Sequence, residues 1–225
     1  MKKYWLFGLF SFFLLWTACD RDSGGGSWNT MNPGKDFTIV ALGDSLTEGW
    51  GVDPEDAYPV LLEEGLRKKG WPVRVINAGI SGETSSGTLS RVGRVIERHK
   101  PQLVILAIGA NDGLNRMSVA SMEENIRKIL TKLEESGIPV LFCGMKLFFN
   151  LGPGYTRDFE EAYAKLAEEK NLQFIPFFLK GVALKPSLNL SDGVHPNGAG
   201  YEEIVRRILP EVERALKKEG VKPIS

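Results

Sequence analysis

The sequence predicts an α/β domain in which a parallel sheet carries helices on both faces. Five short apolar runs alternate along the chain with longer segments of helical periodicity. Strands that alternate with helices favour repeated strand–helix units and a parallel sheet. The composition agrees, because 43% hydrophobic and 25% charged residues in a chain of 225 are ordinary for one globular domain.

The predicted strands are short and largely apolar, as expected for strands covered on both faces. They are Phe37–Leu42, Val73–Asn77, Leu103–Ile108, Val140–Met145 and Leu172–Ile175. Right-handed crossovers make such a chain reverse direction across the sheet at one point, and ligands bind there, at the carboxyl ends of the strands. We therefore expect the chemistry in the loops that follow the strands.

The predicted helices lie between these strands and after the last one. Glycine or proline follows the first two, and the third carries apolar residues at steps of three and four that define one buried face. No internal repeat or second domain is evident, so we expect one domain over 37–218 and a tail over 219–225. The helices are Tyr58–Lys69, Ser85–His99, Val119–Glu135, Asp158–Lys170 and Tyr201–Lys218.

The first 19 residues have the pattern of an export signal. Lys2 and Lys3 precede the apolar run Tyr4–Trp16, which is shorter than the roughly 20 residues of a membrane span. The signal ends at Cys19, and it resembles a bacterial lipoprotein signal, whose cysteine becomes the lipid-modified first residue. It departs from that pattern at Trp16, where leucine is usual.

Two interpretations of the N-terminus follow from this pattern. In the first, Cys19 is lipidated and the protein is a membrane-anchored lipoprotein that faces the periplasm or the extracellular side. In the second, the protein is a soluble periplasmic one. Residues 20–36 are polar and rich in Gly, Ser and Asn, and are predicted to form a flexible linker. If Cys19 is lipidated, Cys143 has no partner for an intramolecular disulfide, and its apolar surroundings indicate a buried small side chain.

The charge balance argues against a nucleic-acid partner. Lys and Arg number 28, as do Asp and Glu, so the formal net charge is zero. No broad basic surface is implied.

The loops after the strands gather residues of one chemical kind. Ser45 follows the first strand, Gly82 the second, Asn111 the third, and Asp192 and His195 the fifth. Because the carboxyl ends of parallel strands share one edge of the sheet, these residues are predicted to lie together.

Ser45 needs a base, because a free hydroxyl is a poor nucleophile near neutral pH. Of the two histidines, His99 ends a helix at the opposite edge, which leaves His195. Asp192 lies three residues before His195, near enough to orient the imidazole, although it has a rival role as N-cap of the final helix, which Pro196 is expected to begin.

An attack by serine on a carbonyl also requires donors for the developing oxyanion. The candidates are the backbone N–H groups of Ser45 and Gly82 and the side-chain amide of Asn111. The neighbouring acids, Asp44 and Asp112, are interpreted as structural groups of the turns.

These residues occur in four ordered blocks that resemble the GDSL or SGNH hydrolase family. The blocks are "GDSL" with Ser45, "AGISGETSSG" with Gly82, "GAND" with Asn111 and "DGVHP" with His195. The wider segments resemble the bacterial thioesterase I, lysophospholipase and arylesterase branch, apart from Ala110 where a second glycine is common. The resemblance implies a flavodoxin-like three-layer α/β/α sandwich with a five-stranded parallel sheet, a catalytic Ser-Asp-His triad, and no metal or cofactor.

Apolar residues after the fourth and fifth strands have two interpretations. Leu147, Phe148 and Phe149 leave the fourth strand, and Phe178 follows the fifth. They either bind the acyl chain of a substrate or cover the core.

The sequence thus predicts a monomeric serine hydrolase that cleaves small carboxylic esters, and acyl thioesters or lysophospholipids as well. Two alternatives remain, a carbohydrate O-acetyl esterase and a non-catalytic lipid- or glycan-binding lipoprotein.

Overall fold

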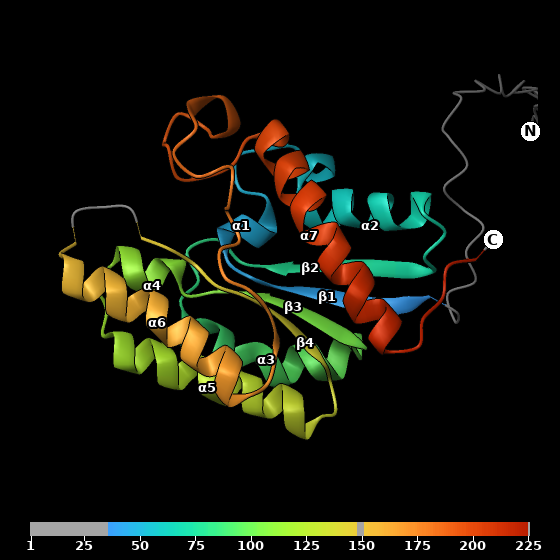
Figure 1. Ribbon diagram of the computed structural model, residues 1–225, viewed down its shortest axis with the longest axis horizontal. Helices are drawn as coiled ribbons and strands as arrows, with labels where there is room; N and C mark the ends of the chain where they lie inside the picture. Colours follow the sequence, from blue (N-terminus) through green and yellow to red (C-terminus); the bar gives the residue numbers. More distant parts are fainter. Residues whose placement is uncertain (1–35, 148–150, 225) are drawn as a thin grey trace, which may run out of the picture. The chain divides into compact units, whose positions relative to one another are not determined.

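The computed structural model describes residues 36–147 and 151–224. Its centre is a five-stranded parallel sheet in the order β2-β1-β3-β4-β5 (Figure 1). This order and the helices on both faces confirm the predicted three-layer, flavodoxin-like fold. The strands are β1 (Phe37–Gly43), β2 (Val73–Gly79), β3 (Leu103–Ala107), β4 (Val140–Cys143) and β5 (Gln173–Ile175).

The chain reverses direction across the sheet at β1. This strand pairs with β2 on one side and with β3 on the other, both in parallel register. Side chains of β1 and β3 are almost all buried, which explains their continuous apolar sequences. A crevice is therefore expected at the carboxyl ends of β1 and β3, where the crossovers diverge.

Two helical layers cover the sheet. Helices α2 (Tyr58–Lys68) and α7 (Gly198–Lys218) pack together on one face, and α3 (Ser85–His99), α5 (Val119–Glu135) and α6 (Pro153–Glu169) pack on the other (Figure 1). Four short helical segments lie in the connections, namely α1 (Ser45–Glu48), α4 (Ala110–Leu114) and the 3₁₀ turns η1 (Pro54–Asp56) and η2 (Pro186–Leu188).

The predicted helix limits hold for α3 and α5 and shift elsewhere. Helix α6 begins at Pro153 rather than Asp158, because proline suits the first position of a helix. Helix α7 begins at Gly198, since the side chain of Asn197 caps it by accepting from the backbone N–H of Gly200 at 3.0 Å. Pro196 is therefore not its first residue, and Asp192 is not its N-cap.

The predicted leader and nearly all of the predicted linker lie outside the described residues, as does Cys19. Within 36–147 and 151–224, no helix combines the length and the apolar composition that crossing a membrane requires. Cys143 is buried in β4, and burial raises the pKa of its thiol.

Candidate active site

Ser45 stands at the junction of β1 and α1, with only 8% of its surface exposed. Asp44 caps this short helix, because its Oδ1 accepts from the backbone N–H of Leu46 at 3.0 Å. Glycines at the ends of β1 and β2 allow β1 to approach β3 closely and β2 to approach α1 closely. A Cβ on Gly43 would lie 2.3 Å from the carbonyl oxygen of Ala107, and one on Gly79 would lie 2.1 Å from the backbone nitrogen of Glu48.

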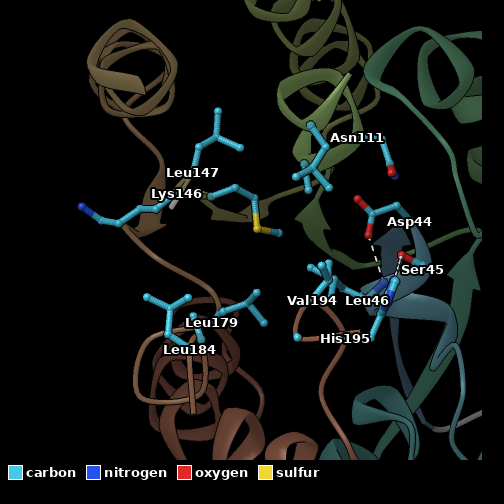
Figure 2. A pocket seen from close by; sticks show the side chains of 15 residues that line it. Asp44, Ser45, Leu46, Asn111, Lys146, Leu147, Leu179, Leu184, Val194 and His195 are labelled. Atoms are coloured by element: carbon cyan, nitrogen blue, oxygen red, sulfur yellow. Dashed lines mark hydrogen bonds between the residues drawn. The ribbon is translucent and has the colours of Figure 1, made fainter. Parts of the chain in front are cut away.

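Ser45, His195 and Asp192 form a continuous chain of hydrogen bonds. The Oγ of Ser45 lies 2.9 Å from Nε2 of His195, and Nδ1 of His195 lies 2.7 Å from Oδ2 of Asp192. Figure 2 shows the imidazole of His195 directed at Ser45 from the loop that follows β5. This arrangement can move a proton from the serine hydroxyl to the imidazole.

The loop that carries His195 is organised by Asp192. Its Oδ1 accepts from the backbone N–H groups of Val194 at 2.8 Å and His195 at 3.0 Å. Burial opposes ionisation of Asp192, but these bonds and the bond to the imidazole outweigh it and hold the pKa of the carboxyl below its ordinary value. Asp192 is therefore ionised at neutral pH and can stabilise an imidazolium.

Asp44 directly precedes Ser45 and lies in a different environment from Asp192. Burial raises its pKa to about 7, and the nearby charges of Glu83 and Asp112 add to this effect, while the bond from Leu46 opposes it. Its Oδ2 has no hydrogen-bond partner among the described residues.

Gly82 occupies a tight turn after β2. The backbone N–H of Glu83 donates to the carbonyl of Ile80 at 3.2 Å, and Gly82 has a φ of +75°. A positive φ at this position is typical of a type II turn and favours glycine. No atom lies within 4 Å of a Cβ built on Gly82, so backbone conformation rather than space accounts for the glycine.

Asn111 lies next to this turn in the folded chain. One N–H of its side-chain amide donates to the carbonyl of Glu83 at 2.9 Å. Because an asparagine amide has two N–H donors, the second is left for another acceptor. Asn111 also lines the same pocket as Ser45 and His195.

The pocket beside Ser45 is walled mainly by apolar side chains from α1, α4 and the segments after β4 and β5 (Figure 2). The apolar residues are Leu46, Ala110, Leu114, Met145, Leu147, Leu179, Ala183, Leu184 and Val194. Of the four residues predicted to bind an acyl chain, Leu147 lies in this wall. Phe178 does not, because it is buried against the ring of Tyr58 with a centroid distance of 5.2 Å, and its neighbour Leu179 lines the pocket instead. Phe148 and Phe149 lie outside the described residues.

Two neighbours of the site are additional to the sequence predictions. The ring of Trp50 lies 4.6 Å from the imidazole of His195, centroid to centroid, although the side chain is 48% exposed. The carboxylate of Glu48 accepts from the backbone N–H of Ser81 at 2.9 Å and from its hydroxyl. An aromatic residue between two glycines, five positions after the serine, was the available signal for Trp50. Among the described residues, no three His, Cys, Asp or Glu side chains are grouped as metal ligands.

Comparisons with known proteins place the chain in a family. Residues 41–203 match the GDSL-like Lipase/Acylhydrolase family. The esterase TesA of Pseudomonas aeruginosa is 34% identical over 179 residues, which cover 80% of this chain and 89% of that protein. The thioesterase 1/protease 1/lysophospholipase L1 of Escherichia coli K12 is 36% identical over 160 residues, which cover 71% of this chain and 76% of that protein.

A solved structure extends the comparison to three dimensions. The SGNH-hydrolase family esterase AlinE4 superposes with a TM-score of 0.69 at 40% identity, and the match covers 82% of this chain and 99% of that one. The chain therefore belongs to the GDSL-like lipase/acylhydrolase family and is an ester-hydrolysing enzyme.

Proposed function

We propose that the enzyme cleaves carboxylic esters, together with acyl thioesters or lysophospholipids, through an acyl-enzyme on Ser45. The observation that carries this proposal is the hydrogen-bonded chain from Ser45 through His195 to Asp192, at 2.9 and 2.7 Å. Its position beside an apolar pocket is the second support.

Acylation begins when the Oγ of Ser45 attacks the substrate carbonyl carbon and Nε2 of His195 takes the hydroxyl proton. Asp192 accepts from Nδ1 and stabilises the imidazolium that forms. The tetrahedral oxyanion is held by the backbone N–H groups of Ser45 and Gly82 and by the amide of Asn111. When the intermediate collapses, the bond to the leaving oxygen or sulfur breaks and His195 returns the proton to that atom.

Deacylation repeats the sequence with water as the nucleophile. His195 takes a proton from the water as it attacks the acyl carbon, and then returns a proton to Oγ as the ester bond to Ser45 breaks. The products are a carboxylic acid and the regenerated serine.

Replacing the nucleophile tests this mechanism. Ser45→Ala should lower kcat for p-nitrophenyl butyrate by about 10⁴-fold or more, because the attacking atom is removed. The variant should also resist covalent labelling by a fluorophosphonate, whereas wild type is labelled. Ser136→Ala is the matched control, since within the described part of the chain its hydroxyl donates only to the carbonyl of Lys132, at an exposed helix end. Retained turnover by a folded Ser45→Ala protein would rule the mechanism out.

The apolar pocket supports an acyl chain as the group bound beside Ser45. We expect kcat/KM to rise from acetyl to longer straight-chain esters, and thioesters and lysophospholipids of the same chain length to be cleaved. Relatives that are 34% and 36% identical to this chain bear names that include esterase, thioesterase and lysophospholipase. A preference for acetylated sugars over butanoyl and longer esters would favour the alternative, a carbohydrate O-acetyl esterase.

We further propose that the protein is exported and lipid-anchored through Cys19, and that its folded domain is a monomer. The lipoprotein-like leader supports the anchor. Cells fed labelled palmitate should incorporate label into the wild-type chain and not into a Cys19→Ser chain. Unlabelled wild type would favour the soluble periplasmic alternative, and size-exclusion chromatography with light scattering tests the monomer.

A further inference from the structure

The turn that holds Gly82 is fastened on both sides by charged side chains. Before it, Ser81 donates its backbone N–H and its hydroxyl to the carboxylate of Glu48 in α1. After it, the carboxylate of Glu83 is bound by Arg91 in α3. The peptide N–H of Gly82 therefore lies between two anchored neighbours.

Arg91 donates hydrogen bonds to backbone carbonyls as well as to its ion-pair partner, Glu83. Its Nε donates to both carboxylate oxygens of Glu83 at 2.7 and 2.9 Å, and its Nη2 donates to one of them at 2.6 Å. The same Nη2 reaches the carbonyl of Ala78 at 2.8 Å and that of Gly43 at 3.2 Å. One guanidinium thus links the end of β1, the end of β2 and the turn between β2 and α3.

Glu83 connects this guanidinium to both loop donors of the proposed oxyanion hole. It follows Gly82 directly, and its carbonyl oxygen accepts from the amide of Asn111 at 2.9 Å. The Glu83 carboxylate also accepts from the hydroxyl of Thr88 at 2.7 Å, so a second residue of α3 holds this side chain. A shift of Glu83 would therefore move the Gly82 N–H and rotate the Asn111 amide together.

Burial of the Arg91–Glu83 ion pair costs free energy unless both charged groups are fully hydrogen-bonded. The side chains of Arg91 and Glu83 are 11% and 8% exposed. Removing two charges from water costs several kcal/mol per ion, and a buried pair is by itself weak evidence for stability. Oxyanion donors act only when they are in place before the charge develops. A rigid guanidinium fork can provide that placement, whereas a lysine ammonium lacks its planar set of donors.

We propose that Arg91 is a positioning residue for the oxyanion hole, acting through Glu83 on the backbone N–H of Gly82 and the amide of Asn111. Arg91 also offsets the negative charge of the buried Glu83 carboxylate. This inference rests on the proposed acyl-enzyme mechanism.

The test compares Arg91→Lys, Arg91→Met and Glu83→Gln with wild type. Arg67→Met is the matched control, because Arg67 bridges Asp36 and Glu63 at 3.0 Å each, at the opposite edge of the sheet. We expect Arg91→Met to lower kcat for p-nitrophenyl butyrate by about 10- to 100-fold, since loss of one oxyanion donor costs roughly 10²–10³. KM should stay within about twofold, and Arg91→Lys and Glu83→Gln should show smaller losses of the same kind.

A tetrahedral inhibitor separates positioning from general loosening of the fold. The affinity for butylboronic acid, which forms a tetrahedral adduct on a nucleophilic serine, should fall by the same factor as kcat in each variant. Arg67→Met should change neither quantity, although its melting temperature falls. If Arg91→Met does not fold, Arg91→Lys and Glu83→Gln carry the test.

Folded Arg91 and Glu83 variants with kcat and boronate affinity within twofold of wild type would overturn the inference. A parallel rise of KM with loss of kcat in all variants, Arg67→Met included, would also overturn it. Failure of the mechanism itself is recognised separately, because an active Ser45→Ala protein would show it.

Discussion

Ser45, the proposed nucleophile, and His195, its proposed base, are held in place by different means, although their side chains meet at 2.9 Å. Ser45 is 8% exposed and follows a buried strand that is paired on both sides, beside the buried Asp44. The side chains of His195 and Asp192 are 19% and 32% exposed, on a loop whose bonds to Asp192 span two or three residues. The position of Ser45 therefore depends on long-range packing, and the position of His195 depends on a local loop conformation.

This difference implies that substitutions around Ser45 and substitutions in the His195 loop affect stability and activity to different extents. A change in the His195 loop can disturb proton transfer while most of the core is untouched. A change under Ser45 alters buried polar groups and so affects the free energy of unfolding.

Among the substitutions that test this comparison, Asp192→Asn is expected to have the largest effect. The asparagine Oδ1 can still accept from the backbone N–H groups of Val194 and His195, so the loop should keep its shape. Its NH₂ group would face Nδ1 of His195 and favour the wrong tautomer, which should lower kcat by about 10²–10⁴-fold. Ester hydrolysis and thermal unfolding measure the two quantities.

Asp192→Ala tests the structural role of the carboxylate, because it removes the bonds to the loop backbone as well as the bond to His195. It should lower the melting temperature more than Asp192→Asn does. An Asp192→Asn enzyme with more than a tenth of wild-type kcat would show that the carboxylate does not orient the base.

A smaller effect, on stability, is expected from Asp44→Asn. The folded-state pKa of Asp44 is raised from 3.8 to about 7, so the folded protein holds a proton that the unfolded chain releases. Wild-type stability should therefore fall as the pH rises from about 4 to about 7, by about 2 kcal/mol between pH 5 and pH 7. The asparagine variant lacks this titration, while its side chain can still cap α1.

Urea unfolding at pH 5, 6, 7 and 8 measures this difference. Parallel pH profiles for wild type and Asp44→Asn would contradict it. Parallel profiles would also show that Asp44 is not part of the buried packing around Ser45 that we compare with the His195 loop.

The smallest effect is expected at Trp50, where the segment that carries Ser45 contacts the loop that carries His195. This side chain follows α1 and its ring lies 4.6 Å from His195. An aromatic contact with an imidazolium at an exposed site is worth about 0.5–1 kcal/mol, so Trp50→Ala should lower kcat about two- to fivefold. Trp50→Phe should retain most of the activity. Equal activity of Trp50→Ala and wild type would mean that the base depends on its own loop alone.

The helices and strands were predictable from the sequence because the spacing of their apolar residues can be recognised there. Helices α3 and α5 begin and end where the apolar pattern and the flanking residues place them. The start of α6 was missed because Gly152, Pro153 and Gly154 suggest a loop, whereas proline and glycine here occupy the first helical turn.

The proximity of Ser45, Asn111, Asp192 and His195 followed from topology, since each comes after a strand of one parallel sheet. Phe178 and Leu179 lie in an irregular segment with no period, so the sequence could not tell which of the two faces the pocket. The contacts of Glu48 with Ser81 and of Arg91 with Gly43 join residues 33 and 48 positions apart, and they depend on packing that no local pattern encodes.

The direction of β1 has a consequence for the whole molecule. The described chain enters this strand at Phe37 and leaves it at Gly43, directly before Ser45. Seven residues of extended strand, about 23 Å at 3.3 Å per residue, separate the point of entry from the nucleophile. The point at which the described chain enters the sheet therefore lies at the opposite end of β1 from Ser45.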